Sequence, residues 1–181
     1  ARVGSHNALF NRTDPPTRFN TLFQYDLLGW VTSVGYGPTE AWFANIFQTE
    51  APVQIGAASW YAASPASQYE LYLYQEPEPG NPSSGKLLLS QKGTIESASY
   101  FTRLLTPAQA IGAGQAFSLV LKLSTPEYNY PVPVQMPIEG YSSKARSAPG
   151  QSFVSTDGKN WDDIGLIWEN TSVCLKALGN S

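Results

Sequence analysis

The residues that could carry catalysis are few in this chain. It contains one histidine, His6, and one cysteine, Cys174. A hydroxyl or thiol nucleophile needs a nearby base to activate it, most often a histidine. His6 lies in a polar N-terminal stretch, whereas Cys174 lies in an apolar run that is typical of a buried, unreactive thiol. Both Cys/His and Ser/His/Asp catalysis are therefore disfavoured, and we predict that the chain is not an enzyme.

The densest group of acidic and amide side chains consists of Asp157, Asn160, Asp162 and Asp163. Neighbouring residues on a strand point to opposite faces, so Asp162 and Asp163 are poorly placed to form a glycosidase pair. Oxygen-rich loops can bind calcium, but this spacing does not match an EF-hand. Zinc would require a His/Cys cluster, which the sequence lacks. The simpler interpretation is turn capping and solvation, so we predict no metal and no cofactor.

Aromatic side chains in predicted loops point instead to sugar binding. A flat ring can cover the apolar face of a sugar, while amide, carboxylate or backbone groups bind its hydroxyls. Loops and strand ends are also where binding residues tend to lie. The candidate ligand-binding residues are Tyr128, Asn129, Tyr130, Tyr141 and Trp161. The alternative is that such rings fill a core, which is the interpretation we favour for Trp30, Trp42 and Trp60.

The composition favours an exported β-protein. Of the 181 residues, 42% are hydrophobic and 13% aromatic, but only 14% are charged, against about 25% in ordinary globular proteins. The net charge of −3 offers no basic surface for nucleic acid. No apolar run approaches the roughly 18 residues that span a bilayer. If the chain is exported, Asn11 and Asn170 are predicted glycosylation acceptors, because each begins an Asn-X-Ser/Thr sequence.

Short strands must position these residues. Alternation of apolar side chains is clearest in residues 69–74 (YELYLY) and 116–123 (AFSLVLKL). Residues 130–135 are placed at a sheet edge because of their two prolines, and a helical turn is expected after Thr106. The other predicted strands cover residues 22–34, 41–48, 53–62, 87–91, 100–105, 152–155 and 173–178.

The stretch 140–163 is predicted to end in the closing hairpin of an antiparallel domain. Residues 152–155 form the first strand, and the sequence Thr-Asp-Gly-Lys at 156–159 forms the turn. The pair Asp157-Gly158 suits a tight turn because glycine adopts positive φ freely and aspartate tolerates it. Trp161 begins the return strand.

Many short strands with almost no helix predict an all-β fold, an antiparallel β-sandwich of jelly-roll type. Crossover helices, which an α/β fold would require, are not evident in the sequence. Residues 1–20 are polar and contain Asp14-Pro15-Pro16, so we predict an N-terminal arm or linker there. Residues 21–181 are predicted to form the β-sandwich domain.

Several segments, taken in their order and spacing, resemble a known family. They are residues 25–30 (YDLLGW), 35–37 (GYG), 41–47 (AWFANIF), 69–74 (YELYLY), 80–85 (GNPSSG), 125–132 (TPEYNYPV), 140–161 and 173–177 (VCLKA). The sequence resembles the lectin-like β-sandwich domain that follows the papain-type cysteine peptidase domain in some bacterial and archaeal cell-surface proteins. The resemblance covers residues 21–179 and implies a lectin-like fold and an extracellular or cell-surface location. It implies neither a ligand nor binding residues, and nothing in this chain resembles the peptidase half.

Two functions of different classes follow. The first is a non-catalytic, extracellular lectin-like module that binds a glycan or cell-surface polymer through loop aromatics. The second is a structural subunit or decorating protein of an extracellular filament or surface layer, docked through its N-terminal arm. Leu9, Phe10 and Phe19 of that arm could add to the sheet edge of another copy or of a second assembly protein.

Overall fold

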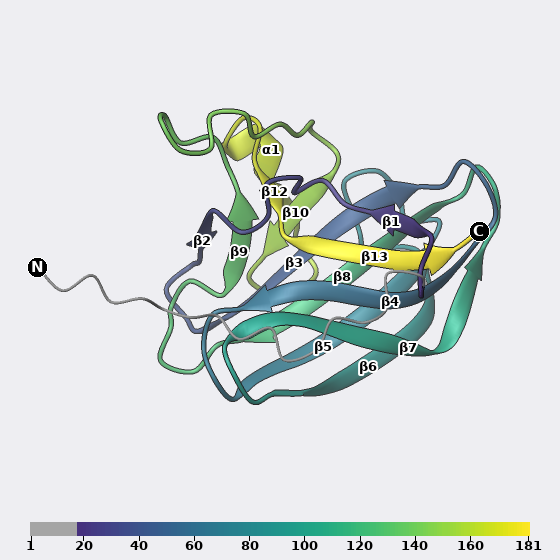
Figure 1. Ribbon diagram of the computed structural model, residues 1–181, viewed down its shortest axis with the longest axis horizontal. Coiled ribbons are helices and arrows are strands. Elements are labelled where there is room, and N and C mark those ends of the chain that lie inside the picture. The colour runs from purple at the N-terminus through teal and green to yellow at the C-terminus, as the bar shows by residue number, and fades with distance from the viewer. Residues whose placement is uncertain (1–17) are drawn as a thin grey trace, which may run out of the picture.

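The computed structural model describes residues 18–181, whose regular secondary structure is almost entirely β-strand (Figure 1). The only helix in this range is one turn, α1 (Ile164–Ile167). The strands are β1 (Thr21–Phe23), β2 (Thr32–Val34), β3 (Glu40–Gln48), β4 (Val53–Ala62), β5 (Ser67–Gln75), β6 (Lys86–Ile95), β7 (Ser99–Ile111), β8 (Ala116–Ser124), β9 (Val132–Gln135), β10 (Ser152–Ser155), β11 (Asp162–Asp163), β12 (Ser172–Val173) and β13 (Leu175–Asn180). Within residues 18–181, no helix has the length and apolar character needed to cross a membrane.

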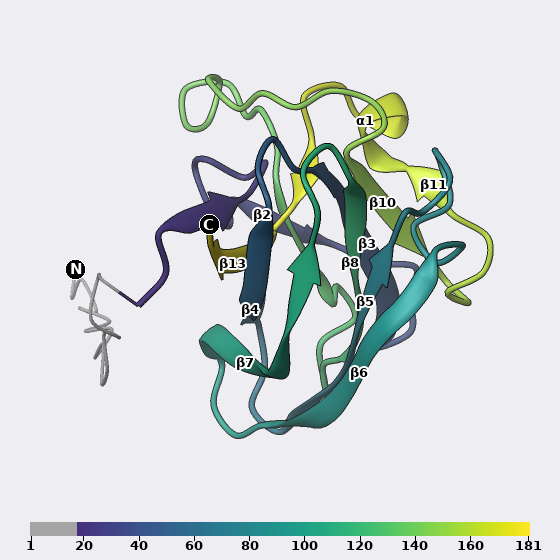
Figure 2. The same ribbon diagram turned by 90° about the vertical axis from the view of Figure 1, so that its right-hand side faces the viewer.

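The strands form three sheets. One has the order β1-β13-β4-β7, the second β11-β10-β3-β8-β5-β6, and the third, smaller sheet β12-β9-β2. Figure 2 shows the four-stranded sheet lying beside the six-stranded sheet, and buried side chains from both form one hydrophobic core. All the strand pairs of these sheets are antiparallel. The predicted fold class, an antiparallel β-sandwich of lectin-like type, is confirmed, and its jelly-roll topology stays a prediction.

The two clearest alternating segments lie at the centre of the sandwich. In β5, Tyr69, Leu71 and Leu73 are buried in the core between the sheets. In β8, the buried core side chains are those at positions 117, 119, 121 and 123. The intervening side chains of both strands point to the opposite side of the six-stranded sheet, which we call the outer face. Both strands were predicted correctly because one face of each packs in the core between the sheets, although Ser118 and Val120 on the outer face of β8 are buried as well.

The three tryptophans that we expected in the core have different environments. Trp60 of β4 is completely buried and packs edge-on against Tyr69 of the opposite sheet, with ring centroids 5.0 Å apart. Trp42 is half-buried on the outer face. Trp30 is 41% exposed in the connection between β1 and β2, so the core interpretation is wrong for this residue.

The predicted strand over residues 22–34 is wrong in part, because two strands of different sheets occupy it. β1 pairs with β13 and β2 pairs with β9. Between them, Gly29 has a φ of 72°, a conformation that L-residues with a side chain rarely adopt. The connection therefore turns the chain from one sheet to the next.

The helical turn expected after Thr106 is absent from the described residues. β7 continues through this segment, and its residues 109–111 pair with residues 53–55 of β4. The edge position predicted for residues 130–135 is also wrong, since β9 lies between β12 and β2. Pro133 has no N–H to donate to the sheet, but its carbonyl accepts a hydrogen bond from the Cys174 backbone N–H at 2.9 Å.

The predicted hairpin over residues 152–163 is present. β10 pairs with β3 on one side and with β11 on the other, so the hairpin closes one edge of the six-stranded sheet. Asp157 caps the turn: its Oδ1 accepts hydrogen bonds from the backbone N–H groups of Lys159 and Asn160, both at 2.8 Å. This local bonding explains the aspartate at position 157, and a φ of 71° explains the glycine at position 158.

The cap makes the turn sensitive to pH. Hydrogen bonds to its ionised form lower the pKa of Asp157 below the usual value. A carboxyl group whose pKa is lower in the folded protein than in the unfolded chain stabilises the fold at pH values above the unfolded-state pKa, about 3.9. This contribution is lost as the pH falls through the folded-state pKa. We therefore expect Asp157→Asn to be less stable than the parent chain at pH 7, with the difference shrinking below pH 3. Urea denaturation of both proteins at pH 7 and at a pH below 3 tests this prediction. A difference in the free energy of unfolding that is the same at the two pH values would contradict it.

The last residues of the predicted arm pack against the domain itself. The Asn20 backbone N–H donates to the Gly179 carbonyl at 3.1 Å. The Phe19 ring lies over Gly56, where an added Cβ would be 2.8 Å from its Cε1. Leu9, Phe10 and the sequon at Asn11 lie outside the described residues, so the role proposed for the arm stays a prediction.

Candidate functional site

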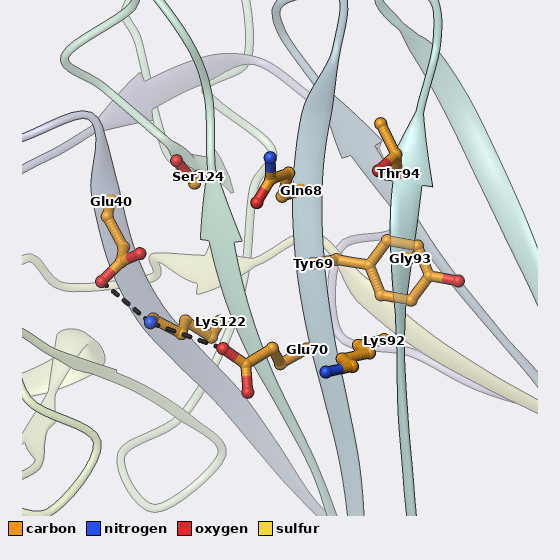
Figure 3. A pocket seen from close by; sticks show the side chains of 9 residues that line it. All are labelled: Glu40, Gln68, Tyr69, Glu70, Lys92, Gly93, Thr94, Lys122 and Ser124. Atoms are coloured by element: carbon orange, nitrogen blue, oxygen red, sulfur yellow. Dashed lines mark ion pairs between the residues drawn. The ribbon is translucent and has the colours of Figure 1, made fainter.

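The outer face of the six-stranded sheet carries two neighbouring rows of side chains. The strand register aligns Glu40, Ser124, Gln68 and Thr94 in one row, and Trp42, Lys122, Glu70 and Lys92 in the next. Together with Tyr69 and Gly93, all of these except Trp42 line a hollow of about 510 Å³, which we call the polar groove (Figure 3). The groove therefore crosses β3, β8, β5 and β6.

Lys122 is the central charge of the polar groove and is fully engaged. Its Nζ lies 3.1 Å from Glu40 Oε1 and 3.5 Å from Glu70 Oε1. It also lies 5.7 Å from the centre of the Trp42 ring, a cation–π arrangement. Although burial opposes it, the two carboxylates raise the pKa of Lys122. Lys122 therefore stays charged and holds the two carboxylates in place.

The second oxygen of Glu70 is engaged as well. The Tyr72 hydroxyl donates a hydrogen bond to Glu70 Oε2 at 2.7 Å, and this bond lowers the pKa of the carboxyl. Burial, with the adjacent carboxylate, raises the pKa of Tyr72 to about 12. The Tyr72 ring in turn stacks on Trp42, with centroids 5.8 Å apart. An aromatic layer thus borders the charged row.

Other groups of the polar groove have no such partners. Among residues 18–181, the side chains of Gln68, Thr94 and Ser124 make no hydrogen bond to the protein, and Lys92 makes no ion pair. Figure 3 shows these side chains on β8, β5 and β6 around the hollow. They are available to a ligand that offers hydroxyl or charged groups.

A second hollow of about 440 Å³, which we call the tryptophan hollow, lies at the β10–β11 edge of the same sheet. It is lined by Gly80, Gly150, Phe153, Trp161, Asp162, Asp163, Leu166 and Ile167. Trp161 is half-buried against the apolar cluster of the outer face, and its Nε1 donates to Ser83 Oγ at 3.0 Å. The ring is therefore held in one orientation beside an apolar wall.

The two carboxylates of the tryptophan hollow differ in their engagement. Asp163 caps α1 by accepting from the Gly165 N–H at 2.9 Å, and it also accepts from the Gly150 N–H at 2.5 Å. Asp162 is exposed and accepts no hydrogen bond within residues 18–181. Asp162 is therefore the carboxylate of this hollow that could bind a ligand hydroxyl.

The structure does not gather the predicted ligand-binding residues into one site. The rings of Tyr128 and Tyr130 contact each other, with centroids 5.8 Å apart, and Asn129 between them is exposed. Their loop precedes β9, whereas Tyr141, 75% exposed, lies in the loop that follows β9 (Figure 1). Of the five, Trp161 lines a hollow, and the ligand role of all five stays a prediction.

The residues of the polar groove were missed by the sequence analysis. The signal was the polar set on the second face of the alternating strands, such as Gln68 and Glu70 in β5 and Lys122 and Ser124 in β8. Such residues usually contact only solvent, and the register that aligns them across strands cannot be read from the chain.

The structure shows where the residues of the glycosylation, thiol and metal predictions lie. Asn170 is half-buried with a φ of 60° between α1 and β12, and its glycosylation stays a prediction. Cys174 is buried, and burial raises the pKa of its thiol well above the ordinary value. His6 lies outside the described residues. No group of three or more His, Cys, Asp or Glu side chains in residues 18–181 could hold a metal ion.

Comparison with known proteins gives the family. The model of the family described as "Lectin like domain" matches residues 22–179. The chain therefore belongs to the lectin-like domain family. A search of curated proteins finds no match.

Two solved structures of similar fold are of one clostridial protein. The cysteine protease Cwp84 after propeptide cleavage has a TM-score of 0.70 and 18% sequence identity; the match covers 89% of this chain and 40% of that one. A structure of the cysteine protease and lectin-like domains of Cwp84, described as a surface layer associated protein of Clostridium difficile, has a TM-score of 0.63 and 18% identity. It covers 78% of this chain, which spans 32% of the other. These matches support the lectin-like fold.

Proposed function

We propose that the chain is a non-catalytic, extracellular binding module that holds a glycan or other cell-surface polymer on the outer face of its six-stranded sheet. The observation that carries the proposal is the presence of two hollows on this face: a largely apolar one that presents the Trp161 ring, and a polar one whose hydroxyl and amide side chains make no hydrogen bond within residues 18–181. Sugars combine apolar ring faces with hydroxyls, so they require both kinds of surface.

The similar structures support the proposed extracellular location of the chain, but they do not indicate its ligand. Cwp84, whose lectin-like domain shares the fold, is described as surface layer associated. An extracellular site also agrees with the low fraction of charged residues and with the two sequons. A non-catalytic role is supported by the burial of the single thiol, Cys174.

The test is a screen of the purified chain against immobilised cell-wall oligosaccharides, followed by titration of each one that binds. For a bound oligosaccharide we expect Trp161→Ala to weaken binding about tenfold, equal to about 1.4 kcal/mol, because the apolar platform is lost. Trp161→Phe keeps a ring and should retain most of the affinity. Tyr100→Ala, on β7 of the four-stranded sheet, is the matched control for an exposed aromatic side chain.

Binding must be read on folded protein, since Trp161 packs against the outer-face cluster. Circular dichroism and a denaturation curve of each variant provide that check. If no cell-wall oligosaccharide binds, or if folded Trp161→Ala binds as well as the parent chain, the outer face is not a glycan site of the kind proposed.

A further inference from the structure

The polar groove contains two lysines in different situations. Lys122 contacts Glu40 and Glu70 at 3.1 and 3.5 Å. Lys92, on the edge strand β6, is exposed and has no ion pair within residues 18–181. An incoming anion would have to displace a carboxylate to reach Lys122, whereas Lys92 can bind it directly. Lys92 is therefore the cation of this groove that is available to a ligand.

The balance of charge in the groove limits what kind of anion fits. The lining contains two carboxylates, Glu40 and Glu70, and two ammonium groups, Lys92 and Lys122, so its formal charges cancel. The chain as a whole carries a net charge of −3. A densely charged polyanion would be repelled by such a surface, because repeated phosphates need a basic patch. A ligand with an isolated acidic group among hydroxyls avoids this repulsion.

The neighbouring row supplies the partners for those hydroxyls. Ser124, Gln68 and Thr94 are aligned across β8, β5 and β6, and Gln68 is in the same strand as Glu70, two positions away. Adjacent strands lie about 4.8 Å apart, so the row is about 10 Å long. In Figure 3 the Thr94 and Lys92 side chains flank Gly93 on β6, at one side of the hollow. Hydroxyl, amide and ammonium groups thus converge on a space the size of a small saccharide.

We propose that the polar groove binds an acidic sugar residue, with its carboxylate or phosphate on Lys92 and its hydroxyls on Gln68, Thr94 and Ser124. This inference rests on the proposed glycan-binding function and specifies one subsite of it. Lys122 and Tyr72 hold the Glu70 carboxylate in place and so define the wall of the subsite beside Lys92.

The experiment uses isothermal titration of the whole chain with three probes. Galacturonate carries a single carboxylate, its methyl ester has the same hydroxyls without charge, and galactose 6-phosphate carries a phosphate in place of the carboxylate. We expect at least one acidic probe to bind at least tenfold more tightly than the ester. We expect Lys92→Met to abolish that preference, and Lys86→Met, an exposed lysine of the same strand outside the groove, to leave it unchanged.

A further variant separates the hydroxyl contacts from the charge contact. Gln68→Ala should weaken the acidic probe and the ester by a similar factor, because it removes a partner of the sugar hydroxyls only. Equal affinity for acid and ester, or a preference that survives Lys92→Met, overturns the acidic subsite. If neutral cell-wall oligosaccharides still bind and respond to Trp161→Ala, the proposed function stands without it. Failure of every sugar to bind rejects both.

Discussion

Replacing Lys176 by methionine is expected to destabilise the domain by about 3–5 kcal/mol, because it leaves a buried carboxylate without its cation. Lys176 Nζ lies 2.5 Å from Asp26 Oδ2 and 2.8 Å from Gln24 Oε1, and both Lys176 and Asp26 are buried. The pair joins the β1–β2 connection to β13. Because domains of this size are stable by about 5–15 kcal/mol, urea denaturation should show a large loss.

The pH dependence of this variant follows from Asp26. Burial raises the pKa of Asp26 even though Lys176 lowers it. The pKa of an aspartate in the unfolded chain is about 3.9. When the pKa in the folded protein is higher than this, the folded protein is most stable with the carboxyl protonated, and stability is lost as the pH rises through the folded-state pKa. Without Lys176 the pKa of Asp26 rises further. We therefore expect the deficit of Lys176→Met to be smaller at pH 4.5 than at pH 7.

Two variants control for this interpretation. Asp26→Leu combined with Lys176→Met removes both charges, and it should recover most of the stability that the single change costs. Lys86→Met, an exposed lysine, should change the free energy of unfolding by less than about 0.5 kcal/mol. A loss below about 1 kcal/mol for Lys176→Met would resemble an exposed ion pair and would contradict the burial argument.

Replacing Trp60 by alanine is expected to cost about 3–5 kcal/mol of unfolding free energy, the range for large aromatic side chains in cores. The Trp60 ring is fully buried and lies 5.0 Å from Tyr69 and 5.2 Å from Phe101, measured between centroids. Tyr69 belongs to the opposite sheet, so removing the ring opens a cavity between the layers. Guanidinium denaturation followed by circular dichroism measures the loss.

Trp60→Phe provides a graded comparison. It keeps an aromatic ring and removes the indole N–H, which has no hydrogen-bond partner within residues 18–181. We expect it to cost less than the alanine change, because the cavity is smaller and an unpartnered donor disappears. Trp168→Ala, at a position 43% exposed, should be nearly neutral. Equal losses at positions 60 and 168 would contradict the role assigned to Trp60.

Much of the β-structure could be predicted from local pattern. Residues 69–74 and 116–123 alternate because one face of each strand packs in the core between the two large sheets. The hairpin at Asp157-Gly158 could be predicted because turn chemistry is local. Predictions were poorer where pairing is long-range: β1 and β2 belong to different sheets, and β9 is a central strand despite Pro133.

The residues of the candidate site also divide into those that local sequence pattern could predict and those that depend on long-range strand pairing. Trp161 could be chosen from its place beside a predicted turn, and it lines the tryptophan hollow. Lys92, Lys122 and Gln68 could not be chosen, because they come from three strands separated in the chain and their alignment depends on strand register. Tyr141 and the loop 128–130 stand apart because β9 separates them.

The sequence alone therefore determined the all-β class and the position of the closing hairpin. These follow from residue types and from spacings of a few residues. The tertiary structure decided which strands are neighbours, and thereby which polar side chains share the outer face. It also placed Asp26 against Lys176, 150 residues away. Such pairs depend on the packing of the whole chain, which local patterns do not encode.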